Sequence, residues 1–134
     1  LGGSIFGKHL RFSPRLKEAR FLAKNFKVNS MIDISDGLTL DLGHILEQSK
    51  VGAVIHTELI PISKQARNLA DALYMGEDFE LLFTLSRKEA KRILTKGLNN
   101  FKPIGEIVDR KLGLRLIDKR NREKNIKPSG FQHF

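Results

Sequence analysis

The sequence contains no cysteine and no tryptophan, and its only tyrosine is Tyr74. The absence of cysteine excludes disulfides, thiolate metal sites and cysteine nucleophiles. Such a chain is compatible with a reducing compartment, and we expect it to be cytoplasmic. No run of about 18 apolar residues occurs, so no membrane partner is expected. The first residues also lack the basic start and long apolar stretch of a signal peptide.

The charge is unbalanced, with 24 basic and 15 acidic residues and a net charge of +9. This excess favours anionic partners, including nucleotides, phosphorylated metabolites and nucleic acid. Apolar residues interrupt the basic runs at helix or strand spacing, which indicates solvated faces of amphipathic elements. No aromatic–basic stacking motif is present, so nucleic acid is not the expected partner. A basic nucleic-acid-binding module remains the alternative from a different class.

A length of 134 residues fits one domain with its own core. The glycine-rich residues 1–12 are expected to be an incoming linker, and residues 13–134 a single domain. Apolar periodicity predicts strands at 30–35, 51–57, 79–85, 101–108 and 113–117, and helices at 13–26, 37–50, 63–73 and 86–97. The polar segment 118–127 is expected to be a hairpin or loop. Since no helix separates the last two strands, the expected class is α+β (α/β-like), with helices packed on a mixed β-sheet.

The stretch from Ser30 to Leu38 predicts a buried strand that turns sharply into a helix. Asp33 lies among apolar residues near the end of this strand, and Ser35-Asp36-Gly37 then breaks the apolar run. Ser35 or Asp36 is a natural N-cap. Free backbone N–H groups at such a turn attract phosphate, while Asp33 and Asp36 attract a divalent cation. The alternative is a capped helix with Asp33 satisfied locally.

Two further segments carry chemically useful side chains. Gly76-Glu77-Asp78 comes just before a predicted strand, so its carboxylates and those of the first turn could line one cleft at the rim of the sheet. The alternative is an ordinary polar turn. The last five residues, 130–134, contain two phenylalanines and a histidine. Such an apolar end is expected to dock on the core or on a ligand.

Taken together, these motifs resemble the carboxy-terminal half of the thiamine-monophosphate kinase family. The matching stretches, in order, are Met31–Leu38, Asp41–Ile45, Ser49–Ala53, Ile60-Pro61, Gly76–Thr84, Ile104-Gly105 and Gly130–Phe134. The resemblance covers nearly the whole chain. It implies a fold like the carboxy-terminal domain of aminoimidazole ribonucleotide synthetase, a member of the same superfamily.

The resemblance also implies an activity, the transfer of the γ-phosphate of ATP to thiamine monophosphate to give thiamine diphosphate. Mg²⁺ is the implied cofactor, and ATP and thiamine monophosphate are the implied small-molecule partners. By motif, Asp33 and Asp36 match metal ligands and Ser35 matches an ATP contact. Glu77 matches a substrate contact, and Phe131 matches an aromatic side chain that packs on the substrate.

The chain departs from the family pattern in two residues and in extent. Met75 stands where the family usually has glycine, and Gln132 replaces an acid. The family's amino-terminal half, which carries further metal-binding aspartates and the main dimer interface, is not in this chain. We therefore expect a fragment of a homodimeric enzyme that is inactive alone. A superfamily enzyme with another small phosphate acceptor, and a scaffold domain without a ligand, remain alternatives.

Overall fold

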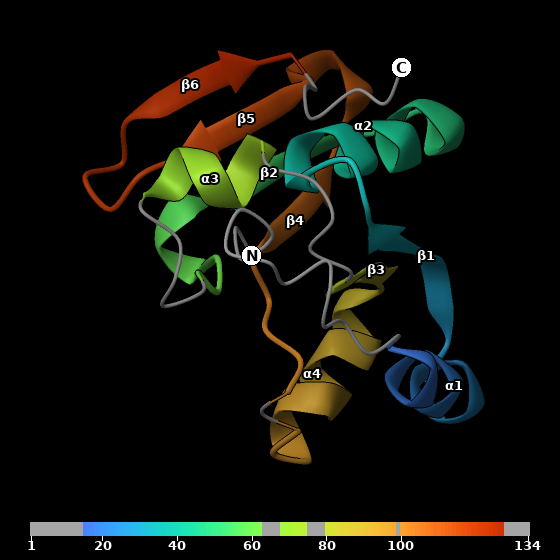
Figure 1. The fold of residues 1–134 in the computed structure, drawn as a ribbon. Helices are drawn as coiled ribbons and strands as arrows, with labels where there is room; N and C mark the ends of the chain where they lie inside the picture. Colours follow the sequence, from blue (N-terminus) through green and yellow to red (C-terminus); the bar gives the residue numbers. More distant parts are fainter. Residues whose placement is uncertain (1–14, 63–67, 75–79, 99, 128–134) are drawn as a thin grey trace.

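The computed structural model describes residues 15–62, 68–74, 80–98 and 100–127, shown in colour in Figure 1. The elements in chain order are α1 (Leu16–Asn25), β1 (Val28–Ile34), α2 (Leu38–Ser49), β2 (Gly52–His56), a 3-10 turn η3 (Thr57–Leu59), α3 (Leu69–Tyr74), β3 (Glu80–Leu85), α4 (Arg87–Thr95), β4 (Gly105–Val108), a 3-10 turn η4 (Arg110–Leu112), β5 (Leu114–Ile117) and β6 (Glu123–Ile126). The predicted linker, the predicted start of the first helix before Arg15, and the aromatic end of the chain lie outside the described residues.

The strands form two sheets rather than the single sheet that the sequence suggested. β1 and β3 form an antiparallel pair, and the other strands form a four-stranded sheet in the order β4-β2-β5-β6. The second sheet is mixed, as predicted, because β2 and β5 are parallel while β4 and β6 are antiparallel to their neighbours. Close approach of β4 to β2 depends on Gly105, where a Cβ atom would collide with the backbone oxygen of Val54.

Two hydrophobic cores hold these elements together. The larger one packs α2 and α3 against the four-stranded sheet and includes Ile34, Leu38, Leu42, Ile55, Leu73 and Leu116. The smaller one lies between α1, α4 and the β1–β3 pair, and centres on Leu22, Phe26 and Ile93. β3 separates them, since Leu82 belongs to the larger core while Leu81 and Phe83 pack on the smaller one. This alternation is the two-residue period of a strand that packs against a core on each face.

Ser86 is the N-cap residue of α4, and its side chain accepts a hydrogen bond from the helix. The N–H of Glu89 donates to the hydroxyl of Ser86 at 3.3 Å. The apolar spacing in this helix predicts that Ala90, Ile93 and Leu94 face inward. Ile93 is buried and Ala90 half-buried as predicted, but the prediction for Leu94 is wrong, because this residue is 58% exposed. The helix ends near Gly97, at a positive φ of 66°, as expected for this residue.

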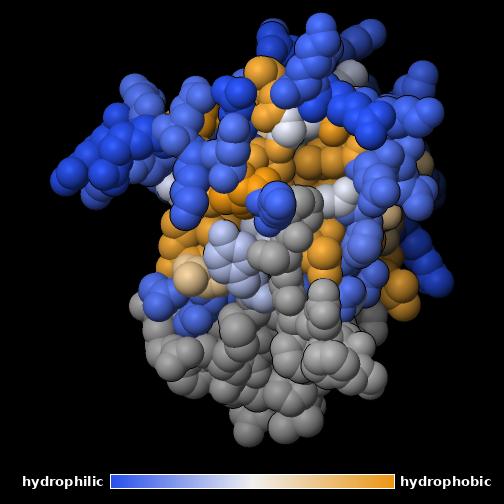
Figure 2. Space-filling model, turned by 90° about the horizontal axis from the view of Figure 1, so that it is seen from above, coloured by the Kyte–Doolittle hydropathy of each residue, from blue (hydrophilic) through white to orange (hydrophobic). Residues whose placement is uncertain are grey.

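The polar segment 118–127 forms a hairpin in which β6 pairs with β5. The carboxylate of Asp118 orders its turn by accepting the N–H groups of Arg120 and Arg122. The hairpin projects to the left in Figure 1 and carries hydrophilic side chains in Figure 2. Figure 2 also shows hydrophobic residues gathered on this face, with hydrophilic side chains around them. No helix within the described residues is both long and apolar enough to span a membrane.

Candidate functional site

The predicted strand–turn–helix is present, but its helix is capped differently from the expectation. β1 ends at the buried Ile34, residues 35–37 form the turn, and α2 begins at Leu38. Gly37 is the N-cap residue, with φ of 114° and no side-chain hydrogen bond to the helix. The prediction that Ser35 or Asp36 is the N-cap is therefore wrong. The chain enters the helix through a positive φ that glycine adopts most readily, so both residues lie before the cap position.

Asp41, in the first turn of α2, is the hydrogen-bond acceptor for the backbone of this turn. Its side chain is buried, with the residue 2% exposed, and Oδ2 accepts the N–H groups of Ser35 and Asp36 at 2.9 Å each. Burial raises the pKa of the Asp41 carboxyl, and the two backbone hydrogen bonds oppose this rise. The N–H groups of Ser35 and Asp36 are therefore already accepted by a carboxylate, and phosphate binding by the N–H groups of the helix start stays a prediction.

The turn brings three potential metal-binding side chains together. One ligand atom each of Asp36, Asp41 and His44 lies within 4.8 Å of the other two. His44 lies in the helix predicted at 37–50, and a single helical histidine is more often a surface or core residue than a ligand. The Asp41-x-x-His44 spacing could have signalled the cluster, since residues three apart are neighbours on a helix.

Asp33, the other predicted metal ligand, is not part of this cluster. It is exposed on β1, and the alternation of the strand places it on the face opposite to Ile34. α2 packs on the Ile34 side, because Ile34 and Leu38 share the larger core. Asp33 and Asp36 therefore leave the strand end on different sides.

The carboxylates in and beside the turn are suitable ligands for Mg²⁺. Mg²⁺ binds oxygen ligands, with few carboxylates and several waters, so Asp36 and the exposed Asp33 offer suitable atoms. Asp41 commits one oxygen to backbone N–H groups, and the imidazole of His44 is a poorer ligand for this hard cation.

The remaining predicted contacts are placed only in part. Ser35 is half-buried within the turn. Glu77 and Phe131 lie outside the described residues. Glu80, the first residue of β3, pairs with Ile34 at the end of β1. The chain thus enters β3 at the same end of the strand pair at which the turn leaves β1, which supports the expectation of a shared rim.

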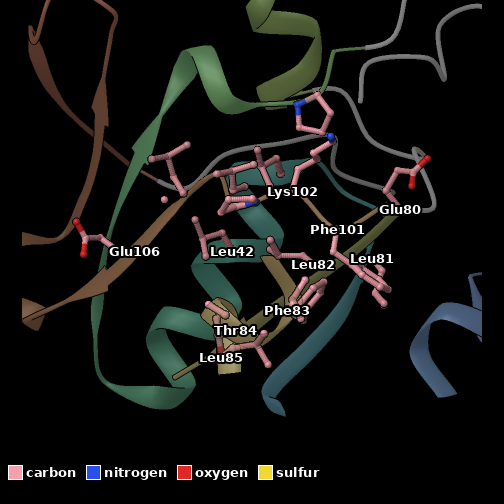
Figure 3. A pocket seen from close by; sticks show the side chains of 18 of the residues that line it. Leu42, Glu80, Leu81, Leu82, Phe83, Thr84, Leu85, Phe101, Lys102 and Glu106 are labelled. Carbon is pink, nitrogen blue, oxygen red and sulfur yellow. The ribbon is translucent and has the colours of Figure 1, made fainter. Parts of the chain in front are cut away.

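A cavity of about 780 Å³ lies between β3 and β4 (Figure 3). Its walls are mostly apolar, and Leu82, Phe83 and Phe101 contribute to them. Glu80 and Glu106 also line it. The carboxylates of the turn do not line this space. The cavity and the acidic turn are therefore separate features of the described residues.

Comparison with known proteins agrees with this fold. The family described as "AIR synthase related protein, C-terminal domain" matches residues 3–117. The thiamine-monophosphate kinase of Buchnera aphidicola subsp. Schizaphis graminum is 44% identical over 141 residues, which cover 97% of this chain and 42% of that protein. The thiamine-monophosphate kinase of Rhodopirellula baltica is 36% identical over 143 residues, covering 99% of this chain and 45% of that protein.

The structural comparison points in the same direction. A solved structure described as "AaThiL complexed with AMPPCP and TMP" matches with a TM-score of 0.72 and 26% identity, covering 98% of this chain and 41% of that one. The chain thus spans less than half the length of these relatives. The family match covers most of the chain and confirms the resemblance found in the sequence. The chain belongs to the AIR synthase related family and matches the carboxy-terminal domain of the proteins in that family.

Proposed function

We propose that this chain is the carboxy-terminal part of a cytoplasmic, ATP-dependent kinase that converts thiamine monophosphate to thiamine diphosphate. The observation that carries the proposal is the 44% identity to a thiamine-monophosphate kinase over 97% of the chain. The neighbouring structure described with AMPPCP, an ATP analogue, and TMP supports the same pair of substrates. Since the chain spans 42% of that kinase, the remaining part of the site comes from residues outside this chain.

The chain contributes positioning and charge to this reaction. Phosphoryl transfer requires aligned oxygens and neutralised negative charge, with little covalent work by the protein. Bound Mg²⁺ supplies the neutralising charge. Asp36 and Asp33 offer carboxylate ligands, each from its own side of β1, and Ser35 lies between them for contact with ATP. Glu77 and Phe131 contact thiamine monophosphate in this proposal.

The proposal also includes a partner domain and an oligomeric state. An amino-terminal domain, outside these 134 residues, completes the nucleotide site. The complete protein is a homodimer through that domain. The excess of basic residues then attracts anionic substrates such as ATP and thiamine monophosphate. Nucleic acid is not needed to explain this charge.

A chimera tests the activity directly. In this construction, the 134 residues replace the matching region of the Buchnera aphidicola kinase. The purified chimera should convert thiamine monophosphate to thiamine diphosphate in the presence of ATP and Mg²⁺, whereas the 134-residue chain alone should not. Unphosphorylated thiamine serves as the control acceptor. A folded chimera that binds ATP but leaves thiamine monophosphate unchanged would contradict the proposal.

A further inference from the structure

We propose that Asp41 is a positioning residue, whose carboxylate fixes the backbone of residues 35–36 and so directs the side chain of Asp36 toward a bound divalent cation. The inference rests on the proposed function and adds a residue to its site. It assigns Asp41 no contact with substrate.

The geometry of the two hydrogen bonds carries the first step. Consecutive N–H groups, from Ser35 and Asp36, converge on the single atom Oδ2 of Asp41. Two bonds to one buried acceptor fix the orientation of both peptide planes. Asp36 is the second of these two residues, so the direction of its side chain depends on the fixed orientation of the peptide planes.

The first turn of α2, which carries Asp41, is anchored to α3. Thr39, 2% exposed, donates its hydroxyl to the backbone oxygen of Leu73 in α3 at 3.3 Å. The N–H of Asp41 donates to the backbone oxygen of Gly37 at 3.0 Å. The first turn of α2 is therefore held by the neighbouring helix, and Asp41 transmits that fixed position to the turn.

The charge of Asp41 indicates a role beyond holding the turn. A neutral amide oxygen could accept the same two N–H groups, and its burial would cost less than that of a carboxylate. The carboxylate adds negative charge within 4.8 Å of ligand atoms of Asp36 and His44. Negative charge at this distance favours a cation at the turn. Asp41 thus supports the cation site in two ways, by orientation and by charge.

The test uses the 134-residue chain, amide NMR and Mn²⁺ as a paramagnetic probe for the divalent cation. In the wild type, Mn²⁺ should broaden the signals of the turn and of His44. Asp41→Ala removes both the acceptor and the charge, and the broadening of the turn should then be lost. Asp41→Asn retains an acceptor for the turn but removes the charge. It should need at least about fivefold more Mn²⁺ for the same broadening, with an unchanged amide spectrum in the cores. Glu47→Gln, which removes an exposed acid from the same helix, should match the wild type.

Three results would overturn the inference. They are equal Mn²⁺ requirements for wild type and Asp41→Ala, no broadening at the turn of the wild type, and an unfolded Asp41→Asn chain. The last would show that the carboxylate is needed for the fold itself. None of these depends on turnover, so an inactive chimera would count against the proposed kinase alone. An active chimera in which Asp41→Ala keeps the wild-type Mg²⁺ requirement would also contradict the role of Asp41.

Discussion

Arg15 donates to both carboxylate oxygens of Glu80, from Nε to one and from Nη2 to the other, each at 3.2 Å. The pair joins the residue before α1 to the first residue of β3, 65 positions later. The hydrogen bond and charge of Glu80 raise the pKa of the Arg15 guanidinium. The forked geometry fixes orientation as well as distance. It therefore holds the start of β3 against α1 at the border of the cavity.

Replacing Arg15 with lysine should lower stability modestly. Lysine keeps the charge but cannot form the fork. The side chain of Arg15 is 45% exposed, so solvent screens the pair and the expected loss is about 0.5–1 kcal/mol. Thermal unfolding at low and high salt would measure it. Arg20→Lys, at an exposed position on α1, is the matched control, and an equal melting temperature for both variants would contradict the prediction.

Gly37→Ala should destabilise the chain by about 1–3 kcal/mol, through backbone strain and a close contact together. The φ of 114° is unfavourable for alanine, and the added Cβ would lie 3.0 Å from the backbone oxygen of Tyr74. That oxygen belongs to α3, so the two helices would have to separate. Urea denaturation would measure the change in the free energy of unfolding.

Gly97→Ala is a reference for a positive φ without a close contact. Gly97 also has a positive φ, of 66°, but an added Cβ there would meet no atom of the described residues within 4 Å. It should cost about 1 kcal/mol, the typical price of a left-handed conformation for alanine. If Gly37→Ala costs no more than Gly97→Ala, close packing against Tyr74 contributes nothing.

The sequence predicted local elements well because their signals are local. The apolar residues around Asp33 and the helical spacing from Leu38 onward are properties of neighbouring positions, and both elements formed as expected. The pairing of β3 with β1, and of β4 with β2, depends on contacts between distant segments. Residue spacing carries no information on such pairing, so the division into two sheets was not predicted.

The candidate site shows the same limit. Capping preferences identify Ser35 and Asp36 as favourable residues, yet they do not reveal that Asp41 folds back to accept both N–H groups. Strand alternation was available in the sequence and places Asp33 opposite Ile34. The Asp41-x-x-His44 spacing was available as well. The geometry of the turn at residues 35–37, which brings Asp36 beside these two residues, was not.

Asp36→Asn should reduce the turnover of the chimera at least about tenfold, because an amide is a weaker ligand for Mg²⁺ than a carboxylate. Gly37, rather than Asp36, is the N-cap residue of α2, so the fold should persist. Steady-state rates across a Mg²⁺ titration, with circular dichroism of the same samples, would measure both effects. Removing Mg²⁺ with EDTA should abolish turnover in wild type and variant alike. A variant that is unfolded would show instead that Asp36 is structural.

The last prediction concerns Glu89, which joins α4 to the end of α1. Its carboxylate accepts the N–H of Lys27 at 2.8 Å and is paired with Arg92 at 2.8 Å. The Arg92 hydrogen bond, followed by that of Lys27, lowers the pKa of the Glu89 carboxyl. A carboxyl with a lowered pKa stabilises the folded state above its unfolded pKa of about 4.3, and this contribution is lost as pH falls through the folded value.

Glu89→Gln should therefore melt below the wild type at pH 7, and the difference should shrink as the pH falls below about 4.3. Asp41 has a raised pKa and changes stability in the opposite direction, but it does so equally in both proteins. Thermal melts from pH 7 to pH 3 would measure the difference, with Glu47→Gln as the control for loss of one acid. A difference between wild type and Glu89→Gln that stays constant over this range would show that the lost contacts act through packing rather than through charge.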